Sequence, residues 1–230
     1  MLGGRPVLLI LFLFSLLVSC KENKLNFKPV DVGEVSAADT TENELDVSNA
    51  NVGRAIWQKP GLVISKLGNI SEKVIADIGA GTGYFSFRLS SKAKKVLAIE
   101  IDPTLIGYID STKQKLPEAY RSRIETRLAK PDDPMVRENE ADVVLIINTV
   151  AYIKDAESYF KNLKKGLKPD GQIMIIDYKM KRLPINAPPK SERIYLDVVE
   201  ELLIKSGYEI LQTDDTSLDY QYIIIARNIK

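Results

Sequence analysis

The stretch at residues 74–85 constrains the fold more than any other part of the chain. Residues 74–78 (VIADI) have the composition of a buried strand, three alternate glycines follow in GAGTG, and a helical pattern begins at Phe85. Glycine adopts positive φ angles and has no Cβ, so a ligand can lie against bare backbone where a strand turns into a helix. The stretch therefore predicts a strand, a ligand-cradling loop and a helix.

From residue 51 onward, short apolar runs alternate with amphipathic stretches. The runs predict strands at 74–77, 96–100, 124–128, 143–148 and 172–178, and the amphipathic stretches predict helices at 85–92, 104–116 and 155–167. Alternation of this kind indicates a parallel sheet with helices on both faces. We therefore predict an α/β, Rossmann-like, doubly wound fold.

The end of the chain has a different pattern. A helix is predicted over 191–206 with Gly207 as its stop, and strands follow at 208–214 and 221–227, joined by a short polar loop. Two consecutive strands with no helix between them must pair antiparallel. The prediction is thus a seven-stranded, mostly parallel sheet with an antiparallel last strand.

The glycine loop departs from the pattern of dinucleotide sites. A G-x-G-x-x-G loop would place a glycine where this chain has Tyr84. Asp77, just before the loop, suits a ligand that bears an ammonium group and a sulfonium better than a pyrophosphate. Glu100 ends the second strand at the distance expected for one βαβ unit, where a carboxylate can accept the hydroxyl groups of a ribose. A solvated acidic strand end beside a structural glycine turn is the alternative.

At these residues the sequence resembles the class I S-adenosylmethionine-dependent methyltransferases, and the resemblance covers residues 51–230. It implies S-adenosylmethionine as the cofactor and methyl transfer to an acceptor as the activity. It also implies roles for individual residues: the methionine end for Asp77, Gly79, Gly81 and Gly83, the ribose for Glu100, and one face of the adenine for Ile101.

Two more cofactor contacts follow from the same resemblance. An acidic residue after the third strand often meets the adenine amino group in this family, and we favour Asp132 over Asp133 for that position. A helix cap or an Asx turn before Pro134 is the alternative for both. Asn148 ends the fourth strand, where the family faces cofactor and substrate, and its alternative is a strand-end turn.

The resemblance leaves the catalytic residues unknown. Residues 54–60 precede the first strand, and in this family an aromatic N-terminal segment often closes over the pocket, so Trp57 and Tyr84 are candidates for a lid. The alternative for Trp57 is packing against the core, which is the more common place for a lone tryptophan on an amphipathic helix. In-line transfer from a sulfonium needs alignment and exclusion of water more than a base. If a base is used, the polar residues near the ends of strands four and five are Tyr152, Asp177 and Tyr178. A proline-rich loop at 181–189 is expected to cover the acceptor pocket.

Composition excludes several kinds of chemistry. The chain has one cysteine, Cys20, and no histidine, so it lacks an internal disulfide and the commonest metal ligand, and we predict no metal site. Without residues 1–19, whose one charged residue is Arg5, basic and acidic residues balance. This neutrality argues against a nucleic-acid partner.

The N-terminal residues predict export. An apolar run at residues 7–18 is too short to span a bilayer, which takes about 20 residues, but it has the length of a signal-peptide core. Residues 17–20 (LVSC) resemble a bacterial lipobox. We expect a lipoprotein signal peptide at 1–19, a lipidated Cys20 with a flexible tether at 20–50, and a methyltransferase-like domain at 51–230. An uncleaved anchor helix is the alternative, and both place the protein at the membrane of the bacterial cell envelope.

Export conflicts with the cofactor, because S-adenosylmethionine is made in the cytoplasm. One alternative is therefore a degenerate methyltransferase fold that serves as a non-catalytic, small-ligand-binding lipoprotein. A nicotinamide-dependent oxidoreductase is a second alternative, against which Tyr84 and the terminal hairpin both argue. For a true transferase we expect a small-molecule or lipid-like acceptor.

Overall fold

The computed structural model of the chain describes residues 51 and 53–229. The predicted signal peptide, Cys20 and the tether lie outside these residues. Within the described part, no helix is long and apolar enough to cross a membrane.

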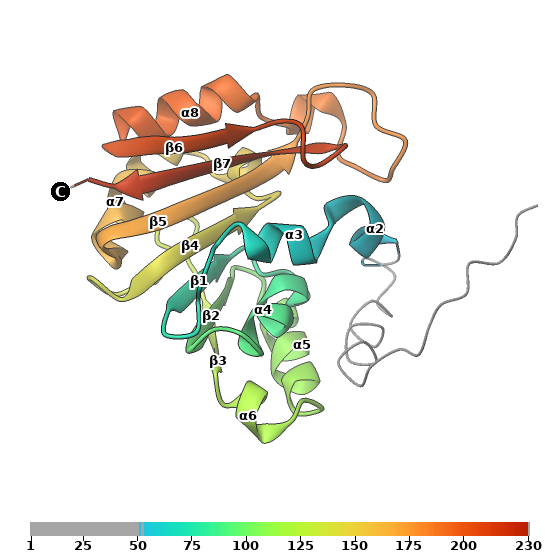
Figure 1. Cartoon of the computed structure of the whole chain (residues 1–230), viewed down its shortest axis with the longest axis vertical. Helices are drawn as coiled ribbons and strands as arrows, with labels where there is room; N and C mark the ends of the chain where they lie inside the picture. Colours follow the sequence, from blue (N-terminus) through green and yellow to red (C-terminus); the bar gives the residue numbers. More distant parts are fainter. Residues whose placement is uncertain (1–50, 52, 230) are drawn as a thin grey trace, which may run out of the picture. The chain divides into compact units, whose positions relative to one another are not determined.

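The described residues form one seven-stranded sheet with helices on both faces (Figure 1). The strands are β1 (Val74–Ile78), β2 (Lys95–Glu100), β3 (Ile124–Leu128), β4 (Ala141–Ile147), β5 (Leu167–Tyr178), β6 (Tyr208–Asp214) and β7 (Gln221–Asn228). The helices are α2 (Arg54–Gln58), α3 (Pro60–Ser65), α4 (Tyr84–Ser90), α5 (Pro103–Lys113), α6 (Glu118–Arg121), α7 (Ala156–Gly166) and α8 (Leu196–Lys205), with 3-10 turns η1 (Val150–Tyr152) and η2 (Lys190–Glu192).

The strand order is β3-β2-β1-β4-β5-β7-β6. Strands β1 to β5 pair in parallel, whereas β7 is antiparallel to both of its neighbours, β5 and β6. The predicted fold, a seven-stranded Rossmann-like sheet with one reversed strand at the end of the chain, is confirmed.

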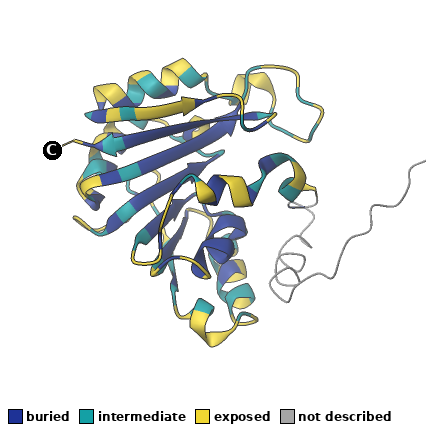
Figure 2. Ribbon diagram, in the orientation of Figure 1, coloured by how far each residue is buried: buried dark blue, intermediate teal, exposed yellow. Residues whose placement is uncertain are grey.

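Alternate residues of each central strand pack into two different apolar layers. Ala76 of β1 belongs to the layer that contains Phe160 of α7 and Leu203 of α8, whereas Ile75 belongs to the layer that contains Val63 of α3 and Leu89 of α4. Strands covered on both faces need continuous apolar sequence, and β1, β4 and residues 173–178 of β5 are accordingly almost entirely buried (Figure 2).

Two helices begin where the sequence supplies a capping carboxylate. The Asp102 side chain accepts a hydrogen bond from the Thr104 amide (2.7 Å), and Pro103 occupies the first turn of α5. Asp155 accepts one from the Ser158 amide (3.1 Å) at the start of α7. A capping carboxylate satisfies a free amide of the first turn, which fixes where these helices start.

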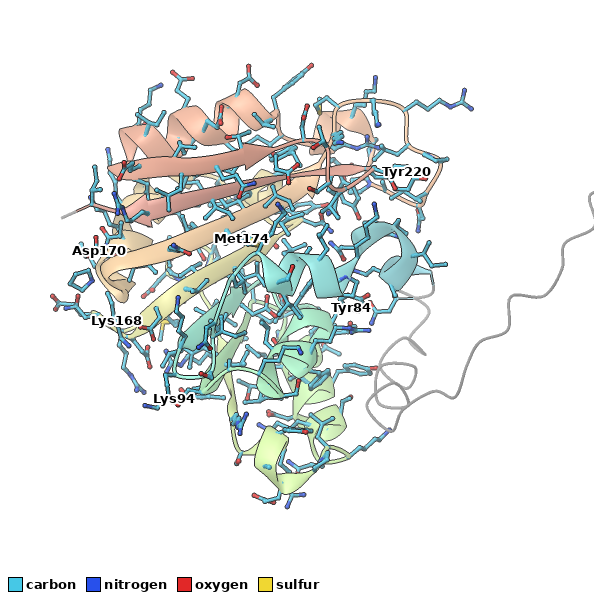
Figure 3. All side chains as sticks on the ribbon, in the orientation of Figure 1. Tyr84, Lys94, Lys168, Asp170, Met174 and Tyr220 are labelled. Atoms are coloured by element: carbon cyan, nitrogen blue, oxygen red, sulfur yellow. The ribbon has the colours of Figure 1, made fainter. Side chains whose placement is uncertain are left out.

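The structure moves two predicted boundaries. Ala141 pairs with Leu167 but Val143 pairs with Gln172, so β5 begins directly after α7, earlier than the predicted residue 172, and contains a bulge around residues 168–171. This bulge lies at the opposite end of the sheet from Tyr84, as the labels Asp170 and Tyr84 show in Figure 3. The last long helix starts at Leu196, later than predicted, because residues 190–192 form the separate turn η2.

A buried carboxylate ties the N-terminal helices to the β6–β7 loop. Asp214 accepts hydrogen bonds from the Ser217 amide (2.9 Å) and the Ser217 hydroxyl (2.6 Å), and it pairs with Lys66 at 2.8 Å. Burial alone would favour the neutral acid, but the ion pair and these hydrogen bonds outweigh it and hold the pKa of Asp214 well below its usual range.

We expect Asp214→Asn to lower the free energy of unfolding by about 2 kcal/mol at pH 7. A depressed carboxyl pKa stabilises the fold above the ordinary pKa, so the difference from wild type should shrink as the pH falls below about 4. Urea unfolding at pH 7 and pH 3.5 measures both effects, with the exposed Asp215→Asn as the matched control. A deficit that stays constant with pH would show that Asp214 stabilises the loop by shape alone.

Candidate functional site

A cavity of about 630 Å³ opens at the carboxyl ends of the central strands, where the strand order reverses between β1 and β4. Open α/β sheets bind their ligands at this switch point. Helix α2 lies at the same end of the sheet (Figure 1). Among the predicted site residues, those that line the cavity are Asp77, Gly79, Gly81, Glu100, Ile101 and Asn148.

The glycine loop has positive φ angles, and at its first position no side chain fits. Gly79 has φ +72, and a Cβ there would lie 2.2 Å from the Thr149 hydroxyl oxygen. Gly81 has φ +57 and lines the cavity, yet no atom lies within 4 Å of the place of its Cβ. The first glycine is therefore needed for packing within the protein, and the second leaves free space beside the cavity.

Gly83, the third glycine of the predicted loop, lies at the start of α4. It precedes α4 with φ +81, and a Cβ there would lie 2.7 Å from the Phe87 ring. It is not among the residues that line the cavity. Its observed contribution is the close approach of the loop to α4.

Glu100 joins the glycine loop to the end of β2. Its Oε2 accepts a hydrogen bond from the Gly81 amide (2.8 Å), and its Oε1 accepts from the amides of Ile101 (2.8 Å) and Asp102 (3.2 Å). The side chain is buried. Because a carboxylate oxygen has two lone pairs, Oε2 retains one position for a ligand hydroxyl.

Asp77 is a buried carboxylate with one side-chain donor. The Ser86 hydroxyl donates to its Oδ2 at 2.6 Å, and the residue is only 3% exposed. Burial raises the pKa of Asp77 to about 6, and the nearby Arg54 opposes that rise. A cationic ligand group beside Asp77 would add a positive charge that stabilises the ionised carboxylate.

Arg54 lines the same cavity and was not identified from the sequence. Its guanidinium lies 4.3 Å from the centre of the Tyr84 ring, and burial lowers its pKa. The sequence predicted that residues 54–60 close over the pocket but pointed to Trp57. A basic residue in a segment expected to cover a polar ligand was the available signal.

The two lid candidates lie in different places. Tyr84 is 2% exposed and lines the cavity, with its ring edge-on to Phe85 at 5.3 Å. Trp57 packs against Tyr178 with ring centres 6.0 Å apart, and it does not line the cavity. Tyr84 therefore forms part of the cavity wall. Trp57 is a packed side chain, which was the alternative to a lid.

The loop after β3 contributes residues to the cavity lining, but its two aspartates are not among them. Lys130 and Pro131 line the cavity, whereas Asp132 is exposed and does not. Asp133 accepts a hydrogen bond from the Met135 amide (2.7 Å), which is the Asx-turn alternative. The geometry thus gives no support to a contact between either carboxylate and the adenine.

Of the three candidates for a base, the structure brings one to the cavity. Tyr152 lines it and is 60% exposed, whereas Tyr178 and Asp177 do not line it. Burial raises the pKa of Asp177 to about 6, and its Oδ1 accepts from the Tyr178 amide at 2.8 Å. Asp177 belongs to the interior beside β7 and not to the cavity wall.

The side chain of Arg193 connects the two ends of the loop at 181–189. The guanidinium donates to the carbonyl oxygens of Lys179 (3.0 Å), Lys181 (2.9 Å) and Pro188 (2.7 Å). One side chain thus fixes both ends of this loop. None of its residues lines the cavity, so its predicted role as a cover for the acceptor is not seen in the geometry.

Comparisons with known proteins agree with this geometry. Residues 76–175 match a family model described as a methyltransferase domain. The tRNA U34 carboxymethyltransferase of Sulfurimonas denitrificans is 24% identical over 166 residues, which cover 66% of this chain and 55% of that protein. The enzyme of the same name from Campylobacter fetus is 22% identical over 184 residues, covering 71% and 62%. The chain thus spans between 55% and 62% of the length of these curated relatives.

Solved structures show the same fold. An S-adenosylmethionine-dependent methyltransferase from Aquifex aeolicus aligns with a TM-score of 0.73 at 20% identity, over 83% of this chain and 98% of its own. The [4+2]-cyclase SpnF aligns with a TM-score of 0.66 at 14% identity, over 76% and 81%.

Residues 76–175 thus match a methyltransferase domain, and the described residues have the fold of an S-adenosylmethionine-dependent methyltransferase of known structure. The matched domain and the solved structures support the predicted class of enzyme and its cofactor, S-adenosylmethionine. The residues present fit that cofactor, because the bare glycine loop, the buried Asp77 carboxylate, the Arg54 guanidinium and the Glu100 carboxylate line one cavity. Among named relatives of the domain are the tRNA U34 carboxymethyltransferases.

The raised pKa of Asp77 predicts a conflict between stability and binding. An acid whose pKa is higher in the fold than in the unfolded chain costs stability above that pKa, and the cost begins as the pH rises past about 4. We expect the free energy of unfolding of Asp77→Asn to exceed that of wild type by about 1–3 kcal/mol at pH 8. At pH 4 the two proteins should be equally stable.

Urea titrations at the two pH values measure this difference. Asp177 has a similarly raised pKa but is present in both proteins, so its contribution cancels. An Asp77→Asn protein that is less stable at pH 8 would mean that Arg54 already compensates the buried charge.

Proposed function

We propose that this chain binds S-adenosylmethionine in the cavity and transfers its methyl group to an acceptor at the cavity mouth. The observation that supports this most is the pairing of opposite charges at one end. Asp77 and Arg54 both line the cavity beside the glycine loop. Together they suit the ammonium and carboxylate groups of an amino acid, which is the end that carries the sulfonium.

The other end of the cavity suits a nucleoside. Glu100 keeps an acceptor position for a ribose hydroxyl, and Ile101 is 52% exposed where it lines the cavity. An exposed apolar side chain beside a polar anchor is a suitable surface for a planar base. Asp132 remains a prediction for the adenine amino group.

Bound S-adenosylmethionine supplies an activated methyl group for in-line displacement. The protein's part is to hold and orient, since Asp77, Arg54 and Glu100 fix the two ends of the ligand and Tyr84 forms a dry wall. Asn148, Tyr152 and Lys154 line the cavity from β4 and the segment that follows it, which is where we place the acceptor.

The chemistry of the lining supports a small-molecule or lipid-like acceptor. Two exposed lysines, Lys130 and Lys154, line the cavity, and Tyr152 adds an exposed ring. These groups suit an anionic or amphipathic acceptor. The curated relatives are named for tRNA, but the balanced charge of this chain favours a different acceptor.

A non-catalytic ligand-binding role is the second candidate. The likeness to a protein named as a [4+2]-cyclase shows that this fold is not restricted to proteins named as methyltransferases. In that role the cavity would bind a nucleoside-like ligand but catalyse no methyl transfer. The protein would then form no S-adenosylhomocysteine with any acceptor.

Ile101→Asp should weaken binding of S-adenosylhomocysteine by the purified full-length protein about tenfold, because the apolar face for the adenine is lost. Leu128→Asp is a matched control, since Leu128 is also 52% exposed and pairs with the strand end at Glu100 without lining this cavity. Calorimetry with S-adenosylmethionine, S-adenosylhomocysteine and NAD measures the affinities. Equal losses in both variants, or tighter binding of NAD, would overturn the proposed site.

We also propose that Cys20 is lipidated and anchors the domain at the cell envelope. The LVSC sequence at residues 17–20 supports this. Labelling of cells with an alkyne palmitate analogue should mark the wild-type protein in the membrane fraction, and Cys20→Ser should abolish the label. A labelled Cys20→Ser protein, or an unlabelled wild type, would remove the lipid anchor from the account.

A further inference from the structure

Four polar side chains form a continuous row behind the cofactor cavity. The Arg54 Nε donates to Gln58 Oε1, Gln58 Nε2 donates to Gln221 Oε1 (3.1 Å), and Gln221 Nε2 donates to Asn148 Oδ1 (2.6 Å). Gln58 and Gln221 are both 0% exposed. We call Arg54, Gln58, Gln221 and Asn148 the amide relay. Its two ends line the cavity, and its two middle members do not.

The direction of the relay is fixed by its first member. A guanidinium has donors and no acceptor, so Gln58 must turn its oxygen toward Arg54 and its NH2 group toward Gln221. Gln221 must then present its oxygen to Gln58 and its NH2 group to Asn148. The orientation of the Asn148 amide is thus set three links away, in α2.

Reversing any one amide would be costly. In a buried row, a flipped amide sets oxygen against oxygen on one side and NH2 against NH2 on the other, and buried polar groups without partners are expensive. The backbone of Asn148 has an unusual positive φ of +56. Its side-chain nitrogen Nδ2 donates to the Tyr178 hydroxyl at 3.4 Å. Its remaining N–H is available to a ligand.

We propose that Gln58 and Gln221 are positioning residues that transmit the placement of Arg54 to the Asn148 amide. The methionine end of the cavity and the end of β4 are then set together, and Asn148 offers an N–H to a lone pair of the cofactor or the acceptor. The functional part of this inference rests on the proposed cofactor site.

A double-mutant cycle on cofactor affinity tests the coupling. Gln58→Leu and Gln221→Leu should each weaken S-adenosylhomocysteine binding by the full-length protein about tenfold, and the double variant should bind no more weakly than either single one. Gln212→Leu, on the exposed side of β6, is the control and should bind as wild type does. Multiplying losses in the double variant, or unchanged affinity in the single ones, would overturn the relay.

A second readout needs no cofactor. The side-chain NH2 resonances of Asn148, assigned by their loss in Asn148→Ser, should shift in Gln58→Leu, although Gln58 has no hydrogen bond to Asn148 among the described contacts. Should Gln58→Leu fail to fold, Gln58→Glu keeps the link to Arg54 and removes the donor to Gln221, and the same shift is expected.

The two readouts separate two failures. Unmoved Asn148 resonances would refute the relay whatever the protein binds. Asn148 resonances that shift in Gln58→Leu, together with a wild-type protein that binds no S-adenosylhomocysteine, would retain the relay and refute the proposed function.

Discussion

The site depends on Glu100, whose side chain accepts hydrogen bonds from backbone amides that follow two neighbouring strands. One oxygen holds the Gly81 amide of the loop after β1, and the other holds the Ile101 amide after β2. Neighbouring parallel strands meet at the same edge of a sheet, so a carboxylate at this place can fix the loop and still face the cavity. The shape of the glycine loop and the position of the proposed ribose anchor therefore depend on the same side chain, Glu100.

The sequence was sufficient to predict the sheet because its strands are buried on both faces. Such strands need unbroken apolar runs, and the runs at β1, β4 and β5 are clear in the sequence. The reversed strand β7 followed from chain connectivity alone. The boundaries that moved, at β5 and α8, depend on a bulge and on the separate turn η2, which apolar periodicity does not encode.

The site was predictable where chemistry follows the strand ends, and less so elsewhere. Asp77, Gly79 and Glu100 reach the cavity because each is fixed by β1 or β2. Arg54 could not be found in the same way, since it comes from a five-residue helix whose position depends on buried amides of β7 and β4. Asp132 fails to reach the cavity for a related reason: the loop after β3 turns on Asp133.

The central claim is that this cavity holds S-adenosylmethionine by Asp77, Arg54 and Glu100. A crystal structure of the full-length protein grown with saturating S-adenosylhomocysteine tests it most directly. The account predicts ribose hydroxyls within hydrogen-bonding distance of Glu100, and the amino acid end between Asp77 and Arg54. A cavity that stays empty at saturation, or a ligand bound elsewhere on the domain, would contradict it.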